Sequence, residues 1–211
     1  MGAPLSALLE DISVPEIGVP DVLSQAAAEA KDIFAPKVRK GWNADAQDEA
    51  RCDFAPDRNS IGHRGVLFAA VWRKSVKGRT LSDVKKDDDM VPFFAENIAL
   101  LIRDFCGSFL RAGDYAVVTT PPRRHRTRNF GERVAEAIAA ILDVDFYSEC
   151  AHAPSRQRVG AVFTPLNIPK QQNVIVVDDI VTTGSTFIAM KNLLTEHGKN
   201  CMFFAGINNK M

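Results

Sequence analysis

The chain has 211 residues, a length that fits one domain of ordinary size with room for an appendage. Apolar residues make up 46% and charged residues 25%, so the composition excludes a disordered chain, a collagen and a disulfide-rich miniprotein. The 26 basic side chains balance 26 acidic ones, and by that sum the protein is neither a basic nucleic-acid binder nor an acidic tail protein.

The zero net charge hides an uneven distribution along the chain. Residues 1–57 hold 11 acidic and 5 basic side chains, whereas residues 58–211 hold 15 acidic and 21 basic ones. An acidic leader therefore cancels a basic body. A basic body with a neutral total suits an anionic ligand that is held in a local site.

Neither a membrane span nor a signal peptide is predicted. The longest apolar run, residues 66–72, is far shorter than the roughly 20 residues that a bilayer requires. The N-terminus lacks a positively charged region followed by an apolar core. We expect free thiols in a reducing cytoplasm, because the cysteines form no Cys-x-x-Cys pair. They are Cys52, Cys106, Cys150 and Cys201.

The first half of the chain divides into a weakly patterned part and a patterned one. Prolines interrupt residues 1–60, where we predict a single helix at 22–34. Residues 1–60 are expected to form an N-terminal extension to a domain at 61–211. Residues 65–72 are predicted as a strand, and residues 73–89 as a charged loop with a short helical turn. Pro92 opens a strong predicted helix that Gly113 ends. Its inward residues are predicted to be Phe94, Ile98, Leu101, Ile102, Phe105 and Phe109.

The second half alternates strands and helices. The pattern predicts helices at 130–142 and at 185–196, the second with Phe187, Met190 and Leu194 facing inward. A long loop at 149–172 contains a strand-like piece at 159–163. This alternation predicts an α/β fold, a parallel β-sheet flanked by helices on both faces. The predicted strands after residue 93 are 115–119, 144–147, 173–177 and 201–205.

The most informative stretch is Val-Ile-Val-Val-Asp-Asp-Ile-Val-Thr-Thr-Gly-Ser-Thr at residues 174–186. Asp178 and Asp179 end an apolar strand, at the edge where open α/β sheets bind ligands. A turn with hydroxyls and a glycine follows and leads into a helix, whose first N–H groups suit a phosphate. Two acids shortly before a phosphate cradle imply one ligand that carries both a diol and a phosphate.

This stretch resembles the signature of the type I phosphoribosyltransferases, which bind phosphoribosyl pyrophosphate (PRPP). The family pattern is an apolar strand, two acids, two variable residues and Thr-Thr-Gly-x-Thr, and all of it is present. The resemblance implies a Rossmann-like phosphoribosyltransferase fold at residues 61–211. It also implies that Asp178 and Asp179 are the catalytic acids that hold the ribose hydroxyls. The 5′-phosphate would lie on Thr182, Thr183, Gly184, Ser185 and Thr186.

The stretch at residues 174–186 is open to three other interpretations. A receiver domain carries its acid pair on the first strand, with about a hundred residues to follow, whereas only 32 residues follow Asp179. A P-loop requires Gly-Lys-Ser/Thr, which the chain lacks. A solvated loop that only looks like the signature is the third interpretation, and thirteen matching residues make it the weaker one.

A second cluster follows the strand at 115–119. Arginines suit bidentate contacts with phosphate oxygens, and four of them occur within residues 123–128. In type I enzymes this loop binds pyrophosphate, so the resemblance assigns that role to Pro121, Arg123 and Arg124. The turn is most similar to the ComF-like subfamily, although residues 128–131 depart in order from its Arg-Gly-Phe-Asn element. Generic basic surface is the alternative.

A third region, residues 153–163, corresponds to the flexible loop that closes over the substrate in this family. Arg156 and Arg158 are candidates to reach the pyrophosphate, and two solvated arginines are the alternative. The N-terminal 60 residues do not match the family, and they lack the cysteine zinc module of ComF-like proteins. We expect them to be helical or to form part of a hood over the base.

The resemblance implies a glycosyltransferase of nucleotide metabolism that displaces pyrophosphate at ribose C1. The carboxylates would favour the oxocarbenium-like centre, and Mg²⁺ would bridge ligand oxygens near Asp178 and Asp179, bound directly or indirectly. The acceptor is a nitrogenous base that the sequence leaves open. Thr182 disfavours 6-oxopurine salvage, because those enzymes place an acid there. The aromatic residues that could line the base site are Trp42, Phe54, Phe68, Trp72 and Phe93.

Three functions stay open at this stage. The first is a catalytic phosphoribosyltransferase, expected as a cytoplasmic homodimer without membrane contact. The second is a PRPP-binding regulator that kept the site without turnover. The third, which the sequence does not favour, is a ComF-like protein that contacts a partner or nucleic acid through its basic body.

Overall fold

The computed structural model describes residues 50–56, 59–121, 129–153 and 162–209. All of these residues belong to one compact unit, residues 43–211. The helix expected at 22–34 lies outside the described residues, as does Trp42. The boundary expected at residue 60 stays a prediction. Across the described part of the chain, no helix is both long enough and apolar enough to cross a membrane.

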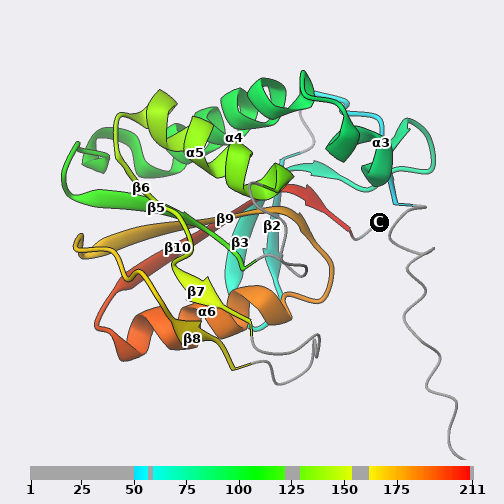
Figure 1. Ribbon diagram of the computed structural model, residues 1–211. Helices are drawn as coiled ribbons and strands as arrows, with labels where there is room; N and C mark the ends of the chain where they lie inside the picture. The colour runs from blue at the N-terminus through cyan, green and yellow to red at the C-terminus, as the bar shows by residue number, and fades with distance from the viewer. Residues whose placement is uncertain (1–49, 57–58, 122–128, 154–161, 210–211) are drawn as a thin grey trace, which may run out of the picture. The chain divides into compact units, whose positions relative to one another are not determined.

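A six-stranded sheet forms the centre of the described part of the chain (Figure 1). Five of its strands, β3, β10, β9, β5 and β6, run parallel to one another. The sixth strand, β2, lies at the edge and pairs antiparallel with β3 as a hairpin. This confirms the expected parallel sheet, to which the structure adds the hairpin. In spatial order the strands are β2 (Ser60–His63), β3 (Leu67–Arg73), β10 (Asn200–Asn208), β9 (Asn173–Val181), β5 (Tyr115–Thr119) and β6 (Asp145–Tyr147).

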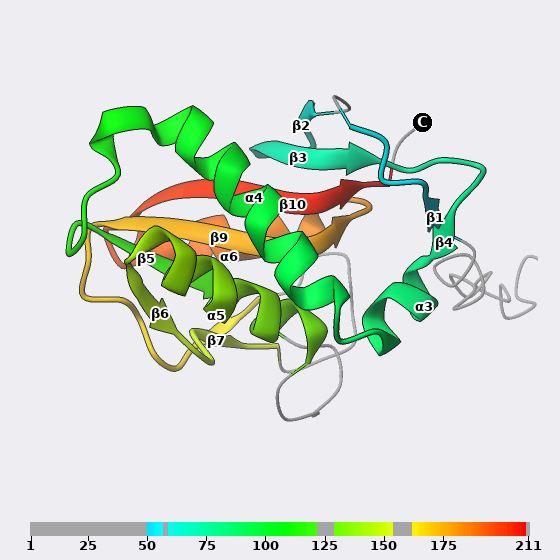
Figure 2. The ribbon, with the colours of Figure 1, turned by 90° about the horizontal axis from the view of Figure 1, so that it is seen from above.

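Helices cover both faces of the sheet, as expected (Figures 1 and 2). The helices α4 (Met90–Cys106) and α5 (Phe130–Leu142) lie on one face, and α6 (Ser185–Glu196) lies on the other. The central strand β9 contributes side chains to the apolar layers on both faces of the sheet, because successive strand residues point to opposite faces. Ile175 and Val177 pack in the layer beneath α4 and α5, and Val174 and Val176 pack in the layer beneath α6.

Short elements surround the sheet. Two small antiparallel ladders pair β1 (Arg51–Cys52) with β4 (Arg79–Thr80), and β7 (Ala151–His152) with β8 (Thr164–Pro165). The expected helical turn is α3 (Leu81–Lys86), which directly precedes α4. Part of the expected N-terminal extension packs into this unit, since Cys52 is buried in the core.

The predicted helices at 130–142 and 185–196 are confirmed with these bounds, and Phe187, Met190 and Leu194 are buried. The strand expected at 173–177 continues to Val181, because residues 178–181 stay in register with β10. Of the piece expected at 159–163, residues 159–161 lie outside the described residues and residues 162–163 form no strand.

The predicted end of the first strong helix was wrong. The helix ends at Cys106, where Gly107 adopts a φ of 52°, and a 3-10 turn, η2 (Gly107–Phe109), follows. The positive φ stops the helical repeat six residues before Gly113. Phe105 is consequently 52% exposed and Phe109 75% exposed, and neither is the core residue that the periodicity predicts.

Candidate functional site

The signature residues gather at the carboxyl edge of the sheet. Asp178 and Asp179 lie inside β9, three and two residues before its last residue, Val181, and not after its end as the sequence predicts. Residues 182–184 follow the end of β9 at this edge and lead directly into α6 (Ser185–Glu196). One strand, one turn and one helix therefore present both acids and the loop at the same edge, where α/β sheets bind ligands.

The two acids differ in their surroundings. Asp178 is half-buried, and its Oδ1 accepts a hydrogen bond of 2.9 Å from the backbone N–H of Asp179. Asp179 is 9% exposed, and its Oδ2 forms an ion pair with Nζ of Lys85 on α3. Because neighbouring strand residues alternate between faces, the two carboxylates leave β9 on opposite sides. The acids are adjacent in sequence and not equivalent in space.

The turn between β9 and α6 requires glycine at position 184. Gly184 is the N-cap of α6 and has a φ of 77°. A Cβ there would come within 2.7 Å of the Cβ and the carbonyl oxygen of Arg64. Thr183 Oγ1 and Ser185 Oγ share a hydrogen bond of 2.9 Å, and the backbone N–H of Ser185 donates to Thr183 Oγ1 at 3.4 Å. The loop thus offers hydroxyls and helix N-terminal N–H groups in a fixed arrangement.

Arg64 is a basic residue at this edge that the sequence does not reveal. It follows β2, and its backbone lies against Gly184. Its Nη2 donates to Asn208 Oδ1 at 3.5 Å, and Asn208, 6% exposed, donates from Nδ2 to Ser60 Oγ at 3.3 Å. These contacts join residues 144 and 148 positions apart, and no local pattern in the sequence reports them.

Pro121 lies next to the signature strand, at the end of β5. The backbone N–H of Thr120 and the hydroxyl of Thr119 both donate to Val177 O, at 3.4 Å and 3.3 Å. Asn129 then caps α5 by accepting from the Glu132 N–H at 3.0 Å. Arg123 and Arg124 lie between these anchors, outside the described residues. Their assignment to pyrophosphate stays a prediction.

The second arginine pair also falls outside the described residues. Arg156 and Arg158 belong to the stretch 154–161, between β7 and β8. Those two strands pair, with His152 opposite Thr164, so the described residues on either side of the stretch lie close together. The proposed contact of this loop with the substrate stays a prediction.

The candidate aromatic residues do not form one surface. Phe54, Trp72 and Phe93 lie together, with Phe93 stacked on Trp72 at 5.2 Å between ring centroids and Phe54 edge-on to Trp72 at 5.1 Å. Phe93 is 37% exposed, whereas Trp72 is buried. Phe68 packs edge-on against Phe187 in the layer beneath α6, so it belongs to the core and is not a lining residue.

The donor set fits a magnesium ion that takes most of its ligands from a substrate. Mg²⁺ binds oxygen and is usually held by one or two carboxylates together with substrate phosphates. Asp178 and Asp179 supply such carboxylates at the edge. Within the described ranges, no group of three or more His, Cys, Asp or Glu side chains could hold a metal ion. A pre-built protein cage is therefore not the arrangement seen among those residues.

Comparison with known families gives a match that contains this edge. The sequence model of the phosphoribosyl transferase domain matches residues 127–210, which include the acids, the loop and α6. Residues 127–210 are thus similar to a phosphoribosyl transferase domain. The match agrees with the resemblance to the type I phosphoribosyltransferases that the signature at residues 174–186 indicates.

Among solved structures, three similar chains are phosphoribosyltransferases. An adenine phosphoribosyltransferase has 16% identity and a TM-score of 0.43, covering 72% of this chain and 85% of its own. The adenine enzyme from Saccharomyces cerevisiae, solved with adenine and an imino-altritol bisphosphate, has 16% identity and a TM-score of 0.42, covering 72% and 83%. An orotate phosphoribosyltransferase from Aeropyrum pernix has 19% identity and a TM-score of 0.39, covering 68% of each. No curated protein matches the sequence significantly.

Proposed function

We propose that the protein binds PRPP with Mg²⁺ and transfers its 5-phosphoribosyl group to a nitrogenous base. The observation that carries this proposal is the edge formed by β9 and α6. Two carboxylates and a glycine turn with four flanking hydroxyl residues occur at this edge, inside the matched range 127–210. A diol and a phosphate on one ligand are what such an edge recognises.

Each part of PRPP has a proposed contact. The loop at 182–186 takes the 5′-phosphate, because its hydroxyls and the N–H groups at the start of α6 suit an anion. Asp178 and Asp179 accept from the ribose hydroxyls. Pro121, Arg123 and Arg124 take the pyrophosphate, and the loop with Arg156 and Arg158 covers it and excludes water.

In the proposed reaction a base nitrogen forms a bond to ribose C1 while the C1–O bond to pyrophosphate breaks. The electron pair of the broken bond leaves on pyrophosphate, and the proton that the nitrogen carried is released. Positive charge develops at the ribose ring as the bond breaks. The carboxylates at the end of β9 favour that charge, and the arginines favour the departing anion. Magnesium, when bound, would neutralise charge on the ligand oxygens, with Asp178 and Asp179 as its candidate protein ligands.

The acceptor is proposed only as a class. Thr182 disfavours a 6-oxopurine, and no other residue of the signature selects a base. Of the described aromatic side chains, Phe93 presents an exposed ring beside Trp72. Planar bases stack on such rings, so this cluster is our candidate for the base side of the site.

A pyrophosphate-release assay tests this proposal. The protein is incubated with PRPP, with and without Mg²⁺, and with each member of a panel of nucleobases. We expect one base to give magnesium-dependent release that the Asp178→Asn plus Asp179→Asn variant loses by at least a hundredfold, about 2.7 kcal/mol of transition-state stabilisation. Binding of PRPP without release for any base would favour the silent regulator. DNA binding that weakens steeply with salt would instead favour the nucleic-acid alternative.

A further inference from the structure

The short helix α3 is held firmly against the core by its apolar side. Leu81 is 6% exposed and Val84 is fully buried, and both belong to the layer beneath α4 and α5. A helix of six residues has little stability of its own, so packing and end contacts must fix its position. In both ribbon views α3 lies near the arrowheads of β9 and β10, at the carboxyl edge of the sheet.

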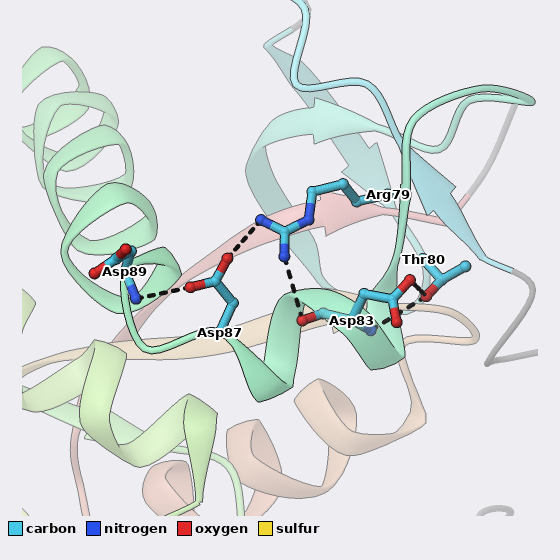
Figure 3. A network of polar contacts seen from close by, with 5 residues as sticks. All are labelled: Arg79, Thr80, Asp83, Asp87 and Asp89. Atoms are coloured by element: carbon cyan, nitrogen blue, oxygen red, sulfur yellow. Dashed lines mark hydrogen bonds and ion pairs between the residues drawn. The ribbon is translucent and has the colours of Figure 1, made fainter.

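Polar contacts fix both ends of α3 (Figure 3). At its start, the N–H of Asp83 donates to Thr80 Oγ1 at 3.1 Å, and the Thr80 hydroxyl donates to Asp83 Oδ2 at 2.5 Å. At its end, Arg79 Nη1 pairs with Asp87 Oδ2 at 2.7 Å. The same guanidinium donates from Nη2 to the carbonyl of Asp83 at 3.5 Å. One arginine thus links the middle of the helix to the residue that follows it.

The two lysines of α3 face different ways. Successive helical residues are about 100° apart, so Lys85 lies beside the buried stripe of Leu81 and Val84 while Lys86 lies further round the helix. Lys85 reaches the sheet edge and pairs through Nζ with Asp179 Oδ2. The Lys85 side chain is 39% exposed and that of Asp179 is 11% exposed. A surface cation therefore neutralises a buried acid of the signature.

We propose that Lys85 is a positioning residue of the PRPP site, acting through Asp179. Lys85 orients the Asp179 carboxylate and cancels one of two neighbouring negative charges, which allows a polyanionic ligand to approach the edge. This inference rests on the proposed function. It assigns a role to a residue that lies outside the matched range 127–210.

Burial distinguishes this pair from an ordinary surface ion pair. Exposed pairs contribute little, because water screens them and long side chains lose conformational freedom. Removing the partner of a buried charge is more disruptive, since the remaining charge stays uncompensated. Asp179 is the buried member, so the loss of Lys85 acts mainly on the acid that the ligand needs. The neighbouring Lys86, in the same helix and of the same charge, provides a matched control.

A calorimetric titration of PRPP in the presence of Mg²⁺ tests the proposal on the full chain. The variants are Lys85→Met, Lys85→Arg, Lys86→Met, Asp179→Asn and the double variant Lys85→Met plus Asp179→Asn. We expect Lys85→Met to raise the Kd about tenfold, Lys85→Arg to recover most of the loss, and Lys86→Met to bind like the wild type. In the Asp179→Asn background, Lys85→Met should cause less than a twofold further change.

Three results would overturn the proposal, and they differ in meaning. Wild-type affinity in Lys85→Met would remove the role of Lys85 while leaving the proposed function intact. An equal loss in the Asp179→Asn background would mean that Lys85 contacts PRPP directly. A wild-type protein that does not bind PRPP would overturn the proposed function and this inference with it. Unfolding midpoints without ligand, measured for every variant, show that the lysine variants are folded at the titration temperature.

Discussion

Gly184 lies in the proposed phosphate loop and has a backbone conformation that favours glycine. Its positive φ and the close approach of Arg64 both oppose a side chain. We expect Gly184→Ala to lower the free energy of unfolding by about 1–2 kcal/mol, because a left-handed conformation is strained for alanine. Urea denaturation measures this loss.

The matched control for that substitution is Gly113→Ala. Gly113 also has a positive φ, of 87°, but a Cβ there meets no atom within 4 Å. The two variants share the backbone strain and differ in the contact with Arg64. We expect the larger loss of unfolding free energy in Gly184→Ala, and equal losses in both variants would contradict the close approach that the structure shows at position 184.

Two thiols make the free energy of unfolding depend on pH in the alkaline range. Burial raises the pKa of Cys150 and of Cys201 to about 11, from a usual value of 9.0. The folded state therefore binds protons more tightly than the unfolded chain between pH 9 and pH 11. Stability from this source is complete below pH 9 and is lost as the pH rises toward 11.

We expect the urea midpoint to fall between pH 9 and pH 11, and to fall less steeply in a Cys150→Ala plus Cys201→Ala variant. The comparison of slopes isolates the thiols, because other alkaline groups are common to both proteins. Parallel slopes for the two proteins would count against buried, protonated thiols. None of the four cysteines forms a disulfide in the structure, so no disulfide complicates the measurement.

Residues of the site were predictable where they belong to one continuous stretch. The signature at 174–186 identifies the acids and the loop because strand, turn and helix follow one another without interruption. Lys85 and Arg64 were not predictable, since each reaches the edge through a contact between distant parts of the chain. Lys85 lies in a charged stretch that the sequence predicts as a loop with a short helical turn, and nothing in that stretch marks Lys85 among its other basic residues.

At the level of elements, predictability follows length and period. The helix α5 was predicted with its true bounds because its apolar residues recur at the helical period from Phe130 onward. The end of α4 was missed, since nothing local marks Gly107 rather than Gly113 as the stop. Ladders of two residues, such as β1 with β4, have no period to detect. The β2–β3 hairpin escaped prediction because β2 is only four residues long.

The helix α3 offers an element-scale prediction. Arg79→Met removes the contacts that join Asp87 and the carbonyl of Asp83. Both members of the ion pair are partly exposed, so the global free energy of unfolding should change little. The N–H groups of residues 81–86 should nevertheless exchange with solvent faster, as amide hydrogen exchange would show.

Asp88→Asn serves as the control for α3, because it breaks the nearby pair with Arg133 and leaves Arg79 in place. We expect it to leave the exchange of residues 81–86 unchanged. Unaltered exchange in Arg79→Met itself would mean that Leu81 and Val84 alone hold the helix. Lys85 would then owe its position to core packing and not to the polar network.

At the scale of the whole molecule, the parallel sheet explains why separate stretches act together. The strands β5 and β9 are neighbours and run in the same direction, so Pro121 and the signature reach the same edge from sequence positions far apart. The basic surplus of residues 58–211 belongs to this part of the chain, where the proposed ligand is an anion. The homodimer and the cytoplasmic location stay predictions from the sequence.

The most direct test of the account is thermal unfolding with PRPP and Mg²⁺. A ligand at a hundred times its Kd stabilises the folded state by about 2.7 kcal/mol, which for a chain of this size raises the Tm by about 5–10 °C. We predict this rise for the wild type and its loss in the Asp178→Asn plus Asp179→Asn variant. An unchanged Tm for the wild type, or an equal rise in both proteins, would contradict a PRPP site at the end of β9.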